Sequence, residues 1–203
     1  ALPPPPVDLH WNPQAAVLPG RATVVEPRVA AMGDFLTGEV ALNDGNYDVG
    51  LRAFRSAVAH DPESPLLRQR LAMLLVRKGM LPEALEHCEK VVEIEPLNTE
   101  ARLLLAGILS ALNRQDDSVA QYRQVIELEP RNQEAYLYLG ALYGKQGKYD
   151  QAVATLTKLI ELNPRSVLGY YYLGRVQTSA GQLDRAEHSF REALAGNPQY
   201  ELI

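Results

Sequence analysis

The stretch VIELEPRN, Val125–Asn132, has close counterparts in the same chain: VVEIEPLN at Val91–Asn98 and LIELNPRS at Leu159–Ser166. The proline of this stretch recurs every 34 residues, at Pro62, Pro96, Pro130, Pro164 and Pro198. A fixed period of this length is typical of repeat proteins, in which each copy is one small structural unit. The chain of 203 residues therefore predicts five tandem repeats, at 31–64, 65–98, 99–132, 133–166 and 167–200.

Small residues predict that each repeat is a pair of packed helices. When the proline is given position 32 of its repeat, position 8 is always small: Gly38, Ala72, Ala106, Gly140 and Gly174. Small side chains let one helix approach another closely. Apolar residues recur around them at helical spacing, as in Leu139 and Tyr143 and then Leu156 and Ile160 of the fourth repeat.

The ends of the predicted helices carry recognisable residues. Position 15 holds glycine or asparagine, which suit the left-handed residue after a helix: Gly45, Gly79, Asn113, Gly147 and Gly181. The proline at position 32 ends the second helix, and the residue two places later can cap the next one. These predicted caps are Ser64, Asn98, Asn132 and Ser166. Each repeat is thus helix, turn, helix, turn.

The stretch EAYLYLGALYGKQGKYDQAVATLTKLIELNPRS, Glu134–Ser166, resembles the tetratricopeptide repeat, whose signature runs from a large residue through Leu-Gly, Tyr, Ala and an aromatic residue to Pro. The resemblance covers 31–198 and implies an all-α fold: a right-handed superhelical solenoid of antiparallel helix pairs with a concave inner side. Departures from the pattern lie in the end repeats, at Asp34, Thr37, Ala41, Gln177 and Glu187.

The resemblance also implies a binding groove, because the first helix of each pair lines the inner side in this family. The residues expected to face a partner are mostly apolar or aromatic: Phe35, Leu42, Arg70, Met73, Val76, Arg77, Leu103, Leu137, Tyr138, Lys145, Tyr171, Tyr172 and Arg175. Tyrosine and arginine are favoured binding anchors. We therefore expect Tyr171, Tyr172 and Arg175 to contribute most.

One subgroup of the family holds the terminal carboxylate of chaperone tails with Lys, Asn and Arg at set positions. In this chain those positions hold Phe35, Glu39, Arg70, Glu100 and Leu104. The carboxylate clamp is therefore missing, and the sequence predicts a protein or peptide segment with apolar or aromatic side chains as the partner.

The sequence predicts no catalytic residues, no metal site and no cofactor. The histidines, His10, His60, His87 and His188, lie far apart and form no metal-ligand spacing. Cys88 occupies position 24, a core position, so a buried inert thiol is expected. Glu83 and His87, four residues apart, are expected to pair along an exposed helix face. The formal charge of −5 argues against nucleic acid as a partner.

The two ends differ from the repeats. Residues 1–30 are expected to form an extended, proline-rich arm or tether, with Pro3–Pro6 in polyproline II. The alternative is an arm that lies along the solenoid or a neighbour, anchored by Trp11, Val24 and Val25. At the other end, the apolar residues Phe190, Leu194, Leu202 and Ile203 are expected to be poorly covered, so the C-terminal repeat is a further candidate docking face.

These observations favour a non-catalytic scaffold for protein–protein interaction within a larger assembly. Two alternatives stay open: a substrate-recruiting module of a larger enzyme, or an envelope lipoprotein that assists assembly of a pilus, secretin or surface complex. No apolar run is long enough for a transmembrane helix. The proline-rich start resembles the tether of a mature lipoprotein, which favours the cell envelope over the cytoplasm.

The register of the repeats can be tested at Leu139, which it places in the core. We expect Leu139→Ala to lower the free energy of unfolding by about 2 to 5 kcal/mol, because it leaves a cavity in packed surroundings. Chemical denaturation of the variant and the wild type measures this difference. An unchanged free energy of unfolding would contradict the register.

Overall fold

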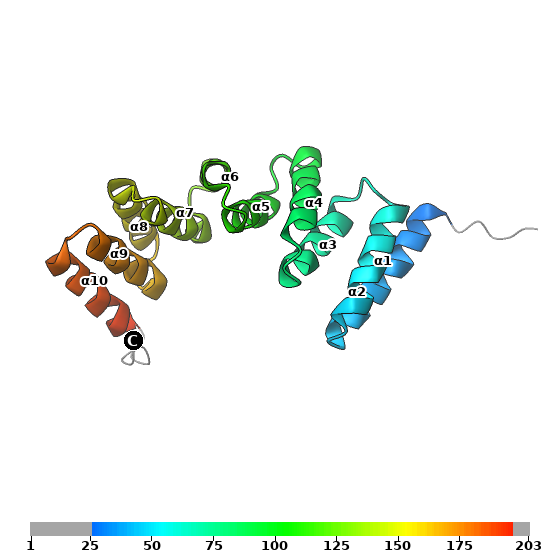
Figure 1. The fold of residues 1–203 in the computed structure, drawn as a ribbon, viewed down its shortest axis with the longest axis horizontal. Helices are drawn as coiled ribbons and strands as arrows, with labels where there is room; N and C mark the ends of the chain where they lie inside the picture. Colours follow the sequence, from blue (N-terminus) through cyan, green and yellow to red (C-terminus); the bar gives the residue numbers. More distant parts are fainter. Residues whose placement is uncertain (1–25, 197–203) are drawn as a thin grey trace, which may run out of the picture.

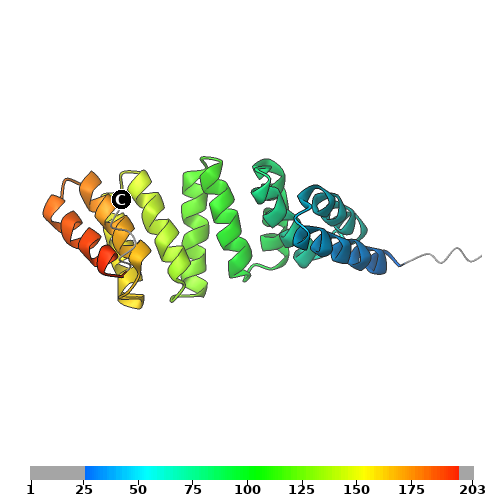
Figure 2. The same ribbon diagram turned by 90° about the horizontal axis from the view of Figure 1, so that it is seen from below.

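The computed structural model describes residues 26–196, which fold into ten α-helices and contain no strand. The helices are α1 (Pro27–Asn43), α2 (Tyr47–His60), α3 (Pro65–Arg77), α4 (Leu81–Ile94), α5 (Thr99–Ala111), α6 (Gln115–Leu128), α7 (Gln133–Lys145), α8 (Tyr149–Leu162), α9 (Val167–Ser179) and α10 (Leu183–Gly196). Consecutive helices form antiparallel pairs, and the pairs follow one another along an arch (Figure 1). Figure 2 shows the same pairs side by side in a single row. The fold is the predicted all-α solenoid.

The predicted helix ends are confirmed. The second residue after each first helix has a positive φ: Gly45 (74°), Gly79 (73°), Asn113 (62°), Gly147 (72°) and Gly181 (75°). Ser64, Asn98, Asn132 and Ser166 each accept a hydrogen bond from the backbone N–H three residues later, at the start of α3, α5, α7 and α9. Local chemistry therefore fixes where the first helices begin and end.

The two helices of a pair touch at the small residue of position 8. A Cβ atom added to Gly140 would lie 2.5 Å from Cγ of Leu156, a fully buried side chain of α8. Gly38 meets Phe54 in the first pair in the same way, and Gly174 meets Phe190 in the last. The absence of a side chain at position 8 therefore lets a large residue at position 24 fill the space between the helices.

The core is shared between neighbouring pairs. One cluster of buried residues runs from Ala31 of α1 to Leu109 of α5, and a second runs from Ala106 of α5 to Val176 of α9. Buried polar residues within this core are hydrogen-bonded. Ser118 donates to the carbonyl of Ala106 at 2.8 Å, while Ser189 donates to Oε1 of Gln177 at 2.7 Å. Gln177 departs from the repeat pattern, and the bond from Ser189 provides its buried amide oxygen with a hydrogen-bond donor.

Helix α1 begins earlier than the sequence predicted. Residues 27–30 were expected to belong to the extended arm, and this was wrong, because Pro27 opens α1. Proline suits the first turn of a helix, since its fixed φ is helical and its missing N–H has no intrahelical partner there. The rest of the arm, including Trp11, Val24 and Val25, lies outside the described residues, as do Leu202 and Ile203.

An ion pair predicted within one helix is instead made between repeats. Glu83 binds Arg55 of the preceding pair, with 2.6 Å between Oε2 and Nη2, and does not pair with His87. Both carboxylate oxygens of Glu83 engage the guanidinium, a geometry that histidine cannot match. Burial lowers the pKa of His87 and so favours its neutral form.

Replacement by alanine is predicted to have opposite effects on stability at two helical glycines, Gly140 at the packed position 8 and Gly107 on an open helix surface. Replacing a helical glycine with alanine stabilises a helix by about 1 kcal/mol where the added Cβ meets open space, as at Gly107. At Gly140 the same methyl would overlap Leu156, and forcing a group into a packed core costs about 1 to 3 kcal/mol. We expect urea unfolding to show a gain for Gly107→Ala and a loss for Gly140→Ala. Equal shifts in both variants would contradict this packing.

Candidate protein-binding groove

The residues expected to face a partner divide into two groups by exposure. Five of the predicted side chains are exposed: Met73, Arg77, Tyr138, Lys145 and Arg175. The other eight are half-buried: Phe35, Leu42, Arg70, Val76, Leu103, Leu137, Tyr171 and Tyr172. Most of the half-buried ones pack against the two core clusters. These side chains therefore take part in packing between helices, while the exposed ones are more accessible to a partner.

Five aromatic side chains gather over the last two and a half repeats, and we call them the aromatic cluster: Tyr122, Tyr138, Tyr171, Tyr172 and Phe190. The ring centres of Tyr122 and Tyr138 are 5.9 Å apart. Tyr171 lies edge-on to Tyr172 at 5.5 Å and 6.2 Å from Phe190. The pKa of Tyr138 is raised by burial, by the carboxylate of Glu134 and by the phenol of Tyr172.

A glycine brings the two halves of the aromatic cluster together. Position 12 of the fourth repeat is Gly144, and a Cβ there would lie 2.7 Å from Cγ2 of Val176 in α9. Helices α7 and α9 consequently make more contact than the first helices of other neighbouring repeats. The other repeats hold larger residues at position 12: Leu42, Val76, Ser110 and Thr178. Gly144 therefore brings α7, which carries Tyr138, close to α9, which carries Tyr171 and Tyr172.

Arg175 lies over the aromatic cluster. Its guanidinium carbon is 5.8 Å from the ring centre of Tyr171 and 5.7 Å from that of Tyr172. A guanidinium at this distance is attracted to the ring faces by about 0.5 to 1 kcal/mol at an exposed site. Arg175 is exposed, so its N–H groups can also bind a carbonyl or carboxylate of a ligand.

Arg70 and Arg77 of the second repeat also make contacts within the chain. Nε of Arg70 lies 3.2 Å from Oε1 of Glu39, which joins α3 to α1. The guanidinium of Arg77 lies 4.1 Å from the ring centre of Tyr47. The positions that would hold a carboxylate in the clamp subgroup thus contain an internal ion pair, Glu39 with Arg70.

The sequence predicted that Tyr138, Tyr171 and Tyr172 face a partner, while Phe190 was expected only as a poorly covered residue of the C-terminal face and Tyr122 was not predicted. Tyr122 and Phe190 occupy position 24, where the structure shows a buried tyrosine and a half-buried phenylalanine. Their contacts with Tyr138 and Tyr171 cross from a second helix to a first helix. An aromatic residue at position 24 next to aromatic residues at positions 5 and 6 is the signal that could have found them.

Within residues 26–196, no group of three or more His, Cys, Asp or Glu side chains could hold a metal ion. His60 binds Asp34, with 3.0 Å between Nδ1 and Oδ2. Cys88 is buried as predicted, and burial raises the pKa of its thiol to about 12. No helix in this part of the chain has the length and apolarity to cross a membrane.

Ten helices in stacked antiparallel pairs define a helical-repeat solenoid. A family model described as the tetratricopeptide repeat matches residues 35–99 and 141–201, and a second, described as TPR repeat, matches 106–147. The chain belongs to the tetratricopeptide repeat family. Such repeats are typically non-catalytic interaction modules, so the fold supports a scaffold for protein–protein interaction.

Solved structures with this fold include a MamA protein, which is 22% identical, with 86% of this chain and 97% of that chain covered and a TM-score of 0.77. A MamA fragment from Desulfovibrio magneticus RS-1 is 17% identical, covering 85% and 97%, with a TM-score of 0.78. YrrB, titled a TPR protein with an unusual peptide-binding site, is 18% identical, covering 84% and 88%, with a TM-score of 0.71. No curated protein sequence matches the chain. At these identities the likeness shows the fold alone.

The environment of Cys88 predicts a thiol that does not react. A thiol with a pKa of about 12 is protonated at neutral pH, and only the thiolate attacks a disulfide reagent. We expect no release of thionitrobenzoate from Ellman's reagent by the folded protein at pH 8, and release of one equivalent after unfolding in guanidinium. Rapid reaction of the folded protein would show that the thiol is accessible and activated.

Proposed function

We propose that the protein is a non-catalytic scaffold that binds an extended segment of a partner over the aromatic cluster, as part of a larger assembly. The observation that carries the proposal is the arrangement of Tyr171 and Tyr172 beneath Arg175. Tyrosine gives a large contact area at little cost in side-chain freedom, and arginine adds several hydrogen-bond donors. Tyr138, exposed over 43% of its surface, offers contact area of this kind to a ligand.

The chemistry of the cluster indicates the kind of segment that it binds. Ring faces favour apolar or aromatic side chains, which lose contact with water when they pack there. The phenol groups and the Arg175 guanidinium can donate hydrogen bonds to the backbone carbonyls of an extended peptide. A terminal carboxylate is not favoured at the clamp positions, because Glu39 already neutralises Arg70 there.

Peptide selection tests the proposal. A displayed library of random peptides is selected on the full chain, and the affinity of the enriched peptides is measured by fluorescence anisotropy. We expect the double variant Tyr171→Ala, Tyr172→Ala to bind at least about tenfold more weakly, since each anchor residue contributes about 1 kcal/mol or more. Arg175→Ala is expected to weaken binding without disturbing the core, because Arg175 is exposed.

Tyr170→Ala is the matched control. Tyr170 is half-buried in the same helix, but it lines a hollow with Ile160 and His188 and makes no aromatic contact with the cluster. We expect this variant to keep its affinity, while circular dichroism confirms that all variants are folded. Binding that survives in the double variant and in Arg175→Ala, or that falls equally in Tyr170→Ala, would rule out the cluster as the site.

A further inference from the structure

Helix α1 exposes a face that the first helices of the other repeats bury. At positions 3, 7 and 10, repeats two to five hold residues buried against the preceding pair: Leu67, Leu71, Leu74, Ala101, Leu105, Ile108, Ala135, Leu139, Leu142, Gly169, Leu173 and Val176. In the first repeat the same positions hold Gly33, Thr37 and Val40, and all three are exposed. Among the described residues, this face of α1 has no preceding helix pair to cover it.

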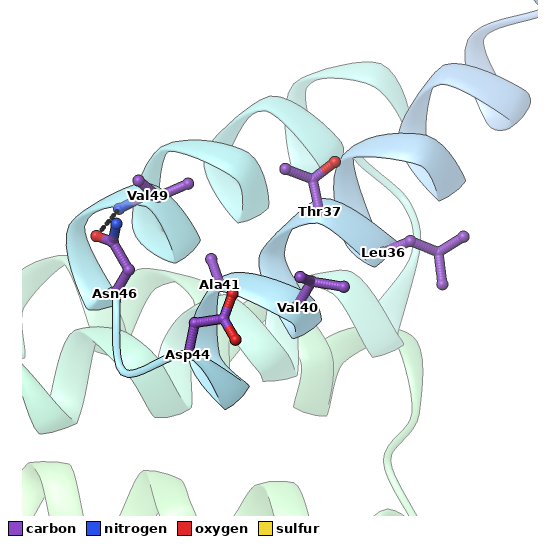
Figure 3. A pocket seen from close by; sticks show the side chains of 7 residues that line it. All are labelled: Leu36, Thr37, Val40, Ala41, Asp44, Asn46 and Val49. Carbon is purple, nitrogen blue, oxygen red and sulfur yellow. Dashed lines mark hydrogen bonds between the residues drawn. The ribbon is translucent and has the colours of Figure 1, made fainter.

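Apolar side chains run along this open face of α1 and beside it. Val29, Met32, Leu36 and Val40 recur every three or four residues and are 54% to 60% exposed. Beside them lies a hollow formed by α1, the following turn and the start of α2, with Leu36, Val40 and Val49 around it (Figure 3). Contiguous exposed apolar surface of this kind marks an interaction site. Single exposed apolar residues are common on protein surfaces and do not indicate a binding site.

The shape and chemistry of the hollow indicate a single inserted side chain. Thr37, which lines the hollow, is smaller than Leu71 at the same position of the second repeat, and this leaves space beside Val40. Asp44 and Asn46 add polar groups at the rim, and Asn46 holds the start of α2 by accepting from the N–H of Val49 (Figure 3). An apolar floor with an acceptor at its edge suits the indole of tryptophan, which has one N–H donor.

A second copy stacked end to end is a poor occupant. The corresponding outer surface at the other end of the solenoid is on α10, where Glu187 and Arg191 form an ion pair at 2.6 Å and are both exposed. Stacking this surface on α1 would take the pair out of water against Leu36 and Val40. Removing charges from water costs more than such a pair returns unless its geometry is excellent.

The chain itself supplies a better occupant. Residues 1–25 lead directly into Glu26 at the start of α1, and they include Trp11 and the apolar residues Val17 and Leu18. A helix rises about 1.5 Å per residue, so Val40 lies about 21 Å from the start of α1. An extended chain spans about 3.1 Å per residue, so the roughly 15 residues between Trp11 and Glu26 can reach twice that far. Covalent linkage also gives the segment a high effective concentration at this face.

We propose that residues 1–25 fold back on the open face of α1 of the same chain and place Trp11 in the hollow beside Val40. In this contact, residues 1–25 take the place that a preceding helix pair has in the later repeats, and they cover the apolar surface of α1. It does not depend on peptide binding at the aromatic cluster, which lies in the last repeats.

Tryptophan fluorescence tests this directly, because Trp11 is the only tryptophan in the chain. In the full chain we expect its emission to lie at shorter wavelength than that of free tryptophan amide and its quenching by acrylamide to be slower. Val40→Asp adds a charge to the hollow at an exposed position, so the helix keeps its fold while the indole is displaced. We expect emission and quenching in this variant to move to the values of the free amide.

Leu97→Asp is the control, because Leu97 is 76% exposed and lies in the turn between α4 and α5. Its tryptophan signal is expected to equal that of the wild type. Emission of the wild type like that of the free amide, or a Val40→Asp signal equal to the wild type, overturns the proposal. Protection that disappears on dilution also overturns it, since the segment would then come from a neighbouring copy.

Discussion

The contact between position 8 of a first helix and position 24 of the second is the constraint on which the solenoid depends. Where glycine stands at position 8, as at Gly38, Gly140 and Gly174, a phenylalanine or leucine of the partner helix occupies the space that a side chain would fill. The interhelical distance set there decides how each pair presents its apolar faces to the next pair. No pair can cover those faces alone, so the continuous core, and the stacking it requires, follow from this one contact.

A glycine at position 12 also allows close packing, here between the first helices of the fourth and fifth repeats. Gly144 draws α9 onto α7 and gathers tyrosines there, while the first repeats carry larger residues at this position and tie their arginines to Glu39 and Tyr47. Arg70 is therefore held in an ion pair with Glu39 in the N-terminal repeats, whereas the exposed Arg175 lies over tyrosine rings in the last repeat. In the proposed function, the residues that bind a partner are those at which individual repeats depart from the common pattern.

The sequence predicted the helix pairs, their caps and their left-handed turn residues, because each of these is decided by residues within about four positions of one another. It did not predict the bond of Arg55 with Glu83 or the part that Tyr122 and Phe190 play in the aromatic cluster. Those contacts depend on the side-chain register between neighbouring helices, which periodicity does not give. The start of α1 at Pro27 was missed because it falls within a proline-rich run that has no helical period.

Each helix pair makes its substantial contacts with the pair next to it. The curvature of the arch therefore follows from the packing angles between neighbouring helix pairs, and each angle sets the orientation of all the pairs that follow it. Gly144 and Val176 meet at the contact between the fourth and fifth repeats, so a change in their packing would alter the position of α9 and α10 relative to the first three repeats. Such a change would also alter the spacing of Tyr171, Tyr172 and Phe190 relative to Tyr122 and Tyr138, because the two groups lie on either side of this contact.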